Sequence, residues 1–160
     1  MIRPACFLDI MPILNLGARY VLEEVSVNGH HSARWEPEMA AHHLAVAVSS
    51  DNLFLWVAVD GCEVVGFLWG GLGEAAPWDS SLVANDYLFY LTPEYRGTRR
   101  GLALIKAWLS WGKSLGCQEV RLSIASGINE ARIGKMFKLL GFDNFGTVYS
   151  YKNGGKNVSN

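Results

Sequence analysis

The most informative part of the chain is Leu91-Thr-Pro-Glu-Tyr-Arg-Gly-Thr-Arg-Arg-Gly-Leu-Ala103. A segment rich in Leu, Phe and Tyr precedes it and an amphipathic helical pattern follows it, so a basic, glycine-containing loop leads straight into a helix. The first amides of a helix have no partner within the helix and lie at the positive end of its dipole, so they bind phosphate oxygens. The stretch therefore predicts an anion-binding loop, to which Arg96, Arg99 and Arg100 add charge and forked hydrogen bonds.

The loop differs from the common nucleotide-binding motifs. No Gly-Lys-Ser/Thr follows it and it lacks the GxGxxG pattern, which argues against a nucleotide triphosphatase and a dinucleotide enzyme. Residues 1–95 hold three cations and twelve acids, a net charge of −9, whereas residues 96–138 hold nine cations and two acids, a net charge of +7. A local basic segment suits a small polyanion such as a nucleotide or pyrophosphate better than a long duplex, and the acidic part would attract a cationic co-substrate. A charged helix face that only keeps this part dissolved remains the alternative.

The length and composition indicate one globular domain. The chain has 160 residues, of which 50% are hydrophobic and 18% charged. Its longest apolar run, at 53–59, is too short to span a membrane, and the first residues break at Asp9 before an export-type apolar core can form, so a cytoplasmic protein is expected. We predict one domain over 1–153 and a flexible tail over 154–160. Three widely spaced cysteines without a CxxC pair are interpreted as small buried apolar residues.

Hydrophobic periodicity predicts a mixed series of helices and strands. The expected elements are a helix over 10–24 with Asp9 as N-cap, a helix over 37–48 that starts at Pro37, a hairpin of 53–59 and 63–71 turned by Asp60-Gly61, a strand over 86–91, a helix over 100–115 closed by Gly116, a strand over 120–124, a helix over 129–140 closed by Gly141, and a final strand or hairpin over 142–151. The segment between 71 and 86 is predicted to be a loop, and Gly70-Gly-Leu-Gly73 a turn. This order is typical of a single α/β or α+β domain.

The stretch Pro93-Glu-Tyr-Arg-Gly-Thr-Arg-Arg-Gly101 resembles the acetyl-CoA loop of the GNAT superfamily of N-acetyltransferases, which commonly reads Pro-Glu-Tyr-Arg-Gly-x-Gly-x-Gly. Arg99 stands where the family usually has glycine. The segment from Asn129 to Lys138-Leu-Leu-Gly-Phe142 is similar to the family's second cofactor segment, so the resemblance covers nearly the whole chain. It implies a single-domain α/β (α+β) GNAT fold, with a central mixed, mostly antiparallel twisted sheet of about six to seven strands flanked by about four helices.

The resemblance also implies where acetyl-CoA binds. The backbone around Leu91 and Thr92 would pair with the pantetheine arm, Arg96 to Leu102 would hold the pyrophosphate, and Asn129 would contact the arm from the other side. In full, the implied cofactor-binding residues are Leu91, Thr92, Arg96, Gly97, Thr98, Arg99, Arg100, Gly101, Leu102, Asn129 and Phe137.

The catalytic groups are assigned by the same resemblance. Many members use a glutamate near the start of the strand before the loop as the base, and Asp86 is its nearest counterpart; a strand-end carboxylate that only accepts backbone hydrogen bonds is the alternative. The family's general-acid tyrosine corresponds to Phe137, whose phenyl ring cannot donate a proton. Tyr149 or water would then protonate the leaving thiolate, or the thiolate would leave unassisted.

These assignments predict an acetyl-CoA-dependent N-acetyltransferase that acts on a primary amine of a small molecule or protein by direct attack in a ternary complex, with a Leu91 or Thr92 amide stabilising the oxyanion. The alternatives are a GNAT-fold CoA-binding or regulatory module with weak or no activity, and acylation of a nucleic-acid-linked amine, against which the acidic remainder argues. The resemblance also allows a homodimer, because members of the family are often dimeric.

No metal is expected. His30, His31, His42 and His43 lie near Glu36 and Glu38, but HExxH is absent. A solvated helix face and part of the acceptor pocket, to which Trp35 would contribute, explain this region better than a metal site.

Overall fold

The computed structural model describes residues 1–26, 34–123, 130–146, 149 and 151. Its contacts divide the chain into two compact units, Met1–Tyr20 with Trp35–Ser123 and Val21–Arg34 with Ile124–Asn160. The predicted tail over 154–160 lies outside the described residues, so the single-domain boundary stays a prediction. None of the described helices is long and apolar enough to cross a membrane.

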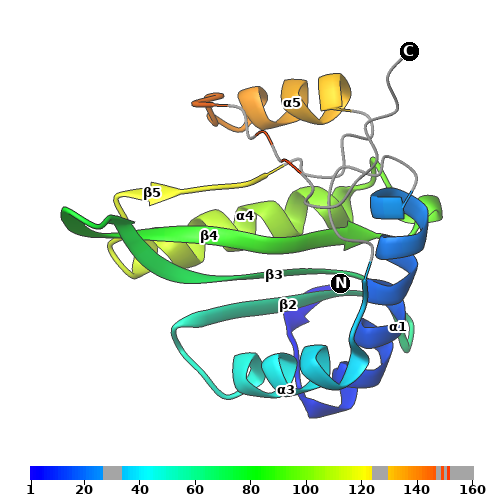
Figure 1. The fold of residues 1–160 in the computed structure, drawn as a ribbon. Helices are drawn as coiled ribbons and strands as arrows, with labels where there is room; N and C mark the ends of the chain where they lie inside the picture. The colour runs from blue at the N-terminus through cyan, green and yellow to red at the C-terminus, as the bar shows by residue number, and fades with distance from the viewer. Residues whose placement is uncertain (27–33, 124–129, 147–148, 150, 152–160) are drawn as a thin grey trace. The chain divides into compact units, whose positions relative to one another are not determined.

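A five-stranded sheet organises the first unit (Figure 1). Its strands follow the chain order and are β1 (Ile2–Pro4), β2 (Leu53–Asp60), β3 (Glu63–Ala76), β4 (Asp79–Leu91) and β5 (Glu119–Val120). The first three pairs are antiparallel, and β4 pairs with β5 in parallel. This confirms the predicted mixed, mostly antiparallel sheet; within the described part of the chain the sheet has five strands rather than six or seven.

Helices cover both faces of this sheet (Figure 1). Helices α1 (Ile10–Tyr20) and α3 (Pro37–Val48) share a core with one face, to which β2 contributes Leu55 and Val57. Helix α4 (Arg99–Ser114) shares a second core with the other face, where β2 contributes Phe54 and Ala58. Side chains alternate between the two faces of a strand, so a strand that is covered on both sides is apolar at nearly every position, as β2 is.

The β2–β3 hairpin was predicted correctly, with one shift at its turn. Asp60 pairs with Glu63, which leaves Gly61 and Cys62 as the connecting residues. Gly61 has φ of +57°, a left-handed conformation that glycine adopts without strain.

The predicted loop between 71 and 86 is wrong. Strand β3 continues to Ala76 and β4 begins at Asp79, so this segment forms the outer half of a long hairpin. Gly70-Gly-Leu-Gly73, predicted as a turn, lies inside β3. Its glycines are explained by close contacts, since a Cβ on Gly70 would lie 2.6 Å from the Trp108 ring and one on Gly71 would overlap the Tyr87 hydroxyl.

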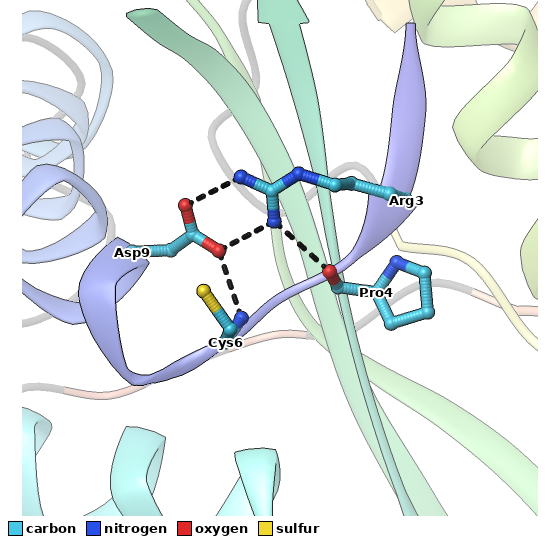
Figure 2. A network of polar contacts seen from close by, with 4 residues as sticks. All are labelled: Arg3, Pro4, Cys6 and Asp9. Atoms are coloured by element: carbon cyan, nitrogen blue, oxygen red, sulfur yellow. Dashed lines mark hydrogen bonds and ion pairs between the residues drawn. The ribbon is translucent and has the colours of Figure 1, made fainter. Parts of the chain in front are cut away.

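The N-terminal corner also differs from its prediction. Asp9 ends a short 3-10 turn (Phe7–Asp9) that leads into α1, so it is not the N-cap residue. Its carboxylate instead accepts two hydrogen bonds from the Arg3 guanidinium, at 2.6 and 2.9 Å, and one from the Cys6 backbone N–H at 2.8 Å (Figure 2). The pair with Arg3 ties β1 to the start of α1.

The remaining helices agree with the predicted ones. Helix α3 begins with Pro37, and α4 ends before Gly116, whose φ of +72° suits a helix C-terminus. In the second unit, α5 (Glu130–Leu139) is followed by Gly141 with φ of +89°. The first predicted helix ends as an α-helix at Tyr20 and is followed along the chain by a π-helical turn (Val21–Val25).

The structure differs from the prediction at the last two expected strands and in the exposure of the cysteines. The strand predicted over 120–124 is reduced to Glu119–Val120, with residue 124 outside the described part. Residues 142–146, 149 and 151 form no strand, and the rest of that predicted strand lies outside the description. Cys6 and Cys62 are exposed and Cys117 is half-buried, so the interpretation of all three as buried residues is wrong.

Candidate functional site

The anion-binding stretch lies where β4 ends and α4 begins. The Thr92 N–H donates to the Val65 carbonyl at 2.9 Å and so extends the pairing of β4 with β3 by one residue. Backbone groups alternate in direction along a strand, so those of Leu91 point to the opposite edge of β4. The Leu91 carbonyl accepts a hydrogen bond from Arg96 Nε at 2.9 Å there, and the Arg96 guanidinium lies 5.4 Å from the centre of the Tyr90 ring.

A tight turn connects the strand to the helix. Pro93–Tyr95 forms a 3-10 turn, and the Thr98 hydroxyl donates to the Tyr95 carbonyl at 2.6 Å. Gly97 has φ of +76°, a left-handed conformation in which a side chain would be strained. The sequence predicts that glycines here allow phosphate to approach the backbone closely. The left-handed conformation of Gly97 is a second reason for glycine at this position.

Helix α4 begins without a side-chain cap. Thr98 occupies the N-cap position, but its hydroxyl does not accept from the helix, so the amides of Arg99, Arg100 and Gly101 have no partner one turn earlier. A Cβ on Gly101 would lie 2.8 Å from Leu91 Cδ1, which explains why glycine is needed where the helix crosses β4. Three uncapped amides beside a left-handed glycine form an arrangement that accepts an anion.

The three arginines of the stretch have different neighbours. Arg96 is turned back onto the end of β4, as described above. Arg100 donates from Nη2 to Asp60 Oδ1 at 2.7 Å and lies 4.8 Å from the centre of the Tyr95 ring. Arg99 is exposed, and its side chain has no partner within the part of the chain that the structure describes. The sequence predicts all three as ligands of the phosphates. In the structure, Arg99 is the one of the three whose guanidinium has no contact with the described part of the chain.

Asp86 lies at a break in the pairing of β4. A β-bulge sets Leu88 opposite Trp69 but Asp86 opposite Gly70, and the parallel pairing with β5 ends at Ala84 opposite Val120. Beyond that point the Asp86 carboxylate accepts hydrogen bonds from Ser123, at 3.0 Å from its N–H and 3.1 Å from its hydroxyl. The side chain of Asp86 thus replaces the backbone acceptor that a continued ladder would supply.

Burial governs the charge of Asp86. It raises the pKa of this carboxyl to about 6, while the hydrogen bonds from Ser123 act in the opposite direction. Such a group is ionised at neutral pH yet accepts a proton more readily than an ordinary carboxylate.

The other predicted site residues belong to the second unit or are not described. Asn129 lies outside the described residues. Phe137 is buried in α5, with its ring centre 5.6 Å from that of Phe142, and Tyr149 is 91% exposed. Their roles at the site stay predictions.

Sequence reasoning missed two partners of the site. The sequence predicts Asp60 as a turn residue and places Ser123 within the strand expected over 120–124. In the structure Asp60 binds Arg100 and Ser123 binds Asp86, across 40 and 37 residues of sequence. Nothing in the local pattern signals such long-range pairs. No group of three or more potential metal ligands occurs within 1–26, 34–123, 130–146, 149 and 151.

Comparisons with known proteins agree with this geometry. The model of the acetyltransferase (GNAT) family matches residues 20–142. A search of curated proteins found no match. Solved structures share the fold at low identity. The tetramutant of the BH1408 protein from Bacillus halodurans has a TM-score of 0.77 at 16% identity and covers 96% of this chain and 99% of its own.

Two further structures are of named acetyltransferases. AAC(6')-Iy, in complex with a bisubstrate analogue of CoA and acetylneamine, has a TM-score of 0.70 at 21% identity over 96% of this chain and 97% of its own. Glucosamine-6-phosphate N-acetyltransferase from Arabidopsis thaliana has a TM-score of 0.71 at 13% identity over 95% and 97%. At these identities they show the fold alone. The family match over most of the length, on a sheet whose β4 leads through a glycine-containing basic loop into an uncapped helix, shows that the chain belongs to the acetyltransferase (GNAT) family.

Proposed function

We propose that the protein binds acetyl-CoA at the 93–102 loop and transfers the acetyl group to a primary amine of a small molecule or protein, by direct attack in a ternary complex. The observation that carries this proposal is the uncapped start of α4, where the amides of Arg99, Arg100 and Gly101 lack helical partners beside the left-handed Gly97. A pyrophosphate would satisfy these amides and lie at the positive end of the helix dipole.

The neighbouring edge of β4 suits the pantetheine arm. Within the described residues, pairing with β5 stops at Ala84, and Leu91 directs its backbone groups to this edge. The Leu91 carbonyl is taken by Arg96, which leaves the Leu91 N–H as a donor for the arm or for the thioester oxygen. The Thr92 N–H is already held by Val65, so of the two amides predicted for the oxyanion we favour that of Leu91.

The reaction needs a neutral amine. Its nitrogen attacks the thioester carbon, the carbon–sulfur bond breaks, and the electron pair leaves on the CoA thiolate. We assign Asp86 as the base that takes the ammonium proton, directly or through water, because its pKa of about 6 keeps it ionised at neutral pH. Each carboxylate oxygen accepts one hydrogen bond from Ser123 and retains a second lone pair for this proton.

The thiolate then needs a proton. Phe137 cannot supply it, and we assign this role to Tyr149 or to water. For the acceptor, the excess of acids in residues 1–95 favours a cationic amine. The named neighbours act on aminoglycosides and on glucosamine 6-phosphate, which illustrates how widely acceptors differ on this fold.

The proposal is tested by the melting temperature with millimolar acetyl-CoA, CoA or ATP. Ligand at about 100 times its Kd stabilises the folded state by about 2.7 kcal/mol, which corresponds to a rise of about 5 °C or more in a chain of this size. A rise with both CoA compounds and none with ATP supports the site, and CoA release with a panel of amines then identifies the acceptor. No shift with any CoA compound contradicts the proposal. Binding without turnover on any amine favours the CoA-binding module instead.

A further inference from the structure

A carboxylate outside the family motif bridges the two ends of the cofactor loop. Asp60, the last residue of β2, accepts hydrogen bonds from the Tyr95 hydroxyl on Oδ2 and from Arg100 Nη2 on Oδ1. Tyr95 ends the 3-10 turn and Arg100 lies in the first turn of α4, so these two residues bracket residues 96–99. The contacts span 35 and 40 residues of sequence.

The three side chains also hold one another. The Arg100 guanidinium lies over the Tyr95 ring, 4.8 Å from its centre, which is a cation–π arrangement. The Nε–H of Arg100 is buried and finds no acceptor among the described residues, so Asp60 and the Tyr95 ring are the contacts that position this guanidinium there. Its orientation toward the β2–β3 turn directs Arg100 away from the role of phosphate ligand.

A carboxylate such as Asp60 is unexpected next to a site proposed for a polyanion. A negative charge beside a site for a polyanion weakens binding by simple repulsion. An exposed ion pair adds little to the stability of the fold, so stability alone does not explain it. Fixing both ends of a loop before the ligand arrives lowers the conformational cost of binding, which offsets the repulsion.

We propose that Asp60 is a positioning residue for acetyl-CoA binding: through Tyr95 and Arg100 it clamps the two ends of the 96–99 turn, so that the backbone amides are held ready for the pyrophosphate. The inference rests on the proposed function. It leaves Arg99 as the arginine that adds charge at the cofactor and makes Asp60 a part of the site that the motif does not contain.

The decisive comparison is between Asp60→Asn and Glu63→Gln. Glu63 is the cross-strand neighbour of Asp60 and is exposed. Its charge acts on Tyr95 through space, but it accepts no hydrogen bond from Tyr95 or Arg100 in the described part of the chain. Both substitutions remove one negative charge from the same hairpin turn, and by charge alone both would tighten binding of a polyanion. The clamp predicts the opposite sign for Asp60→Asn, with acetyl-CoA affinity weakened about fivefold by calorimetric titration, and an unchanged or slightly tighter affinity for Glu63→Gln.

A second readout needs no cofactor. Amide hydrogen exchange of the 93–102 segment in the free protein is expected to be faster in Asp60→Asn and unchanged in Glu63→Gln. Tyr95→Phe, which keeps the ring under Arg100, is expected to weaken affinity about twofold and serves if Asp60→Asn does not fold. The double variant Asp60→Asn/Tyr95→Phe is expected to lose less than the product of the single losses, because both act through one contact.

The outcomes separate the two proposals. Tighter binding by Asp60→Asn, or loop exchange equal to that of the unmodified protein, overturns the clamp. An unmodified protein that does not bind acetyl-CoA contradicts the proposed function, and the exchange comparison in the free protein then decides for or against the clamp on its own.

Discussion

Asp9, which is buried, and Asp86, which is half-buried, are two carboxylates of the first unit whose pKa values move in opposite directions. The Arg3 guanidinium holds the pKa of Asp9 down at about 2, whereas burial raises the pKa of Asp86 to about 6. The difference lies in the partner: Asp9 accepts hydrogen bonds from a cation, whereas the donors that Asp86 has among the described residues are neutral, chiefly the N–H and hydroxyl of Ser123. A carboxylate that is paired with a cation stabilises the fold around it. A carboxylate that is desolvated without a cation has a raised pKa and accepts a proton more readily, as a general base must.

The largest effect that we expect is the loss of turnover in Asp86→Asn. Asp86→Asn keeps the shape of the side chain and a carbonyl acceptor for the Ser123 N–H, but it removes the carboxylate that we propose as the base. We expect kcat to fall about 100-fold or more. Steady-state CoA release measures this, with Glu74→Gln, an exposed residue on β3, as the control. Unchanged kcat in Asp86→Asn would leave Asp86 with the structural role alone.

The next effect is on stability at the N-terminal corner. Asp9→Asn removes the charge that Arg3 binds in Figure 2, and we expect a loss of about 2 kcal/mol in the free energy of unfolding at pH 7. The folded-state pKa lies below the ordinary value, so this stability is complete above pH 4 and is lost as the pH falls toward 2. Urea unfolding at pH 7, 5 and 3 measures it, and Asp51→Asn at an exposed position serves as the control. A difference that does not shrink at low pH would contradict the ion pair as its source.

The same chemical change at Asp86 is expected to act in the other direction. The folded-state pKa of about 6 lies above the ordinary value, so the contribution of Asp86 to stability is complete below pH 4 and is lost as the pH rises through 6. Asp86→Asn is neutral at every pH, and we expect it to be more stable than the unmodified protein by about 1 kcal/mol at pH 8. Thermal unfolding at pH 4 and pH 8 measures this. Equal losses for Asp9→Asn and Asp86→Asn at pH 8 would break the comparison.

The smallest effect concerns the partner of Asp86. Ser123→Ala removes the hydroxyl donor and keeps the N–H donor, so the ionised carboxylate loses part of its support and the pKa of Asp86 rises further. We expect the acidic limb of the kcat profile to move up by roughly half a pH unit with little change in the plateau. A plateau that collapses while the limb stays in place would assign Ser123 a role other than this one.

Local signals predicted much of the fold. Pro37 marked the start of α3, Gly116 and Gly141 marked the ends of α4 and α5, and the apolar run of β2 was read as a strand. These features depend on residues that are neighbours in sequence, which is why the sequence carries them.

The errors have tertiary causes. The sequence predicts a turn at the glycines of β3 because glycine is frequent in turns, whereas in the structure Gly70 and Gly71 make room for the Trp108 ring and the Tyr87 hydroxyl. Asp9 was read as an N-cap because its carboxylate precedes a helix, whereas it is engaged by Arg3. At the site, the glycine loop was predictable from its pattern, but Asp60 lies 40 residues from Arg100 and no local rule connects them.

We propose above that the amides at the start of α4 bind the pyrophosphate of acetyl-CoA. The most direct measurement is the amide NMR spectrum during a titration with acetyl-CoA, followed at Gly97 and Gly101 at the loop and at Gly61 on the β2–β3 turn. We expect the resonances of Gly97 and Gly101 to move most and to saturate with the binding curve, while that of Gly61 moves little. Saturable binding that leaves Gly97 and Gly101 in place, or no binding at all, would contradict it.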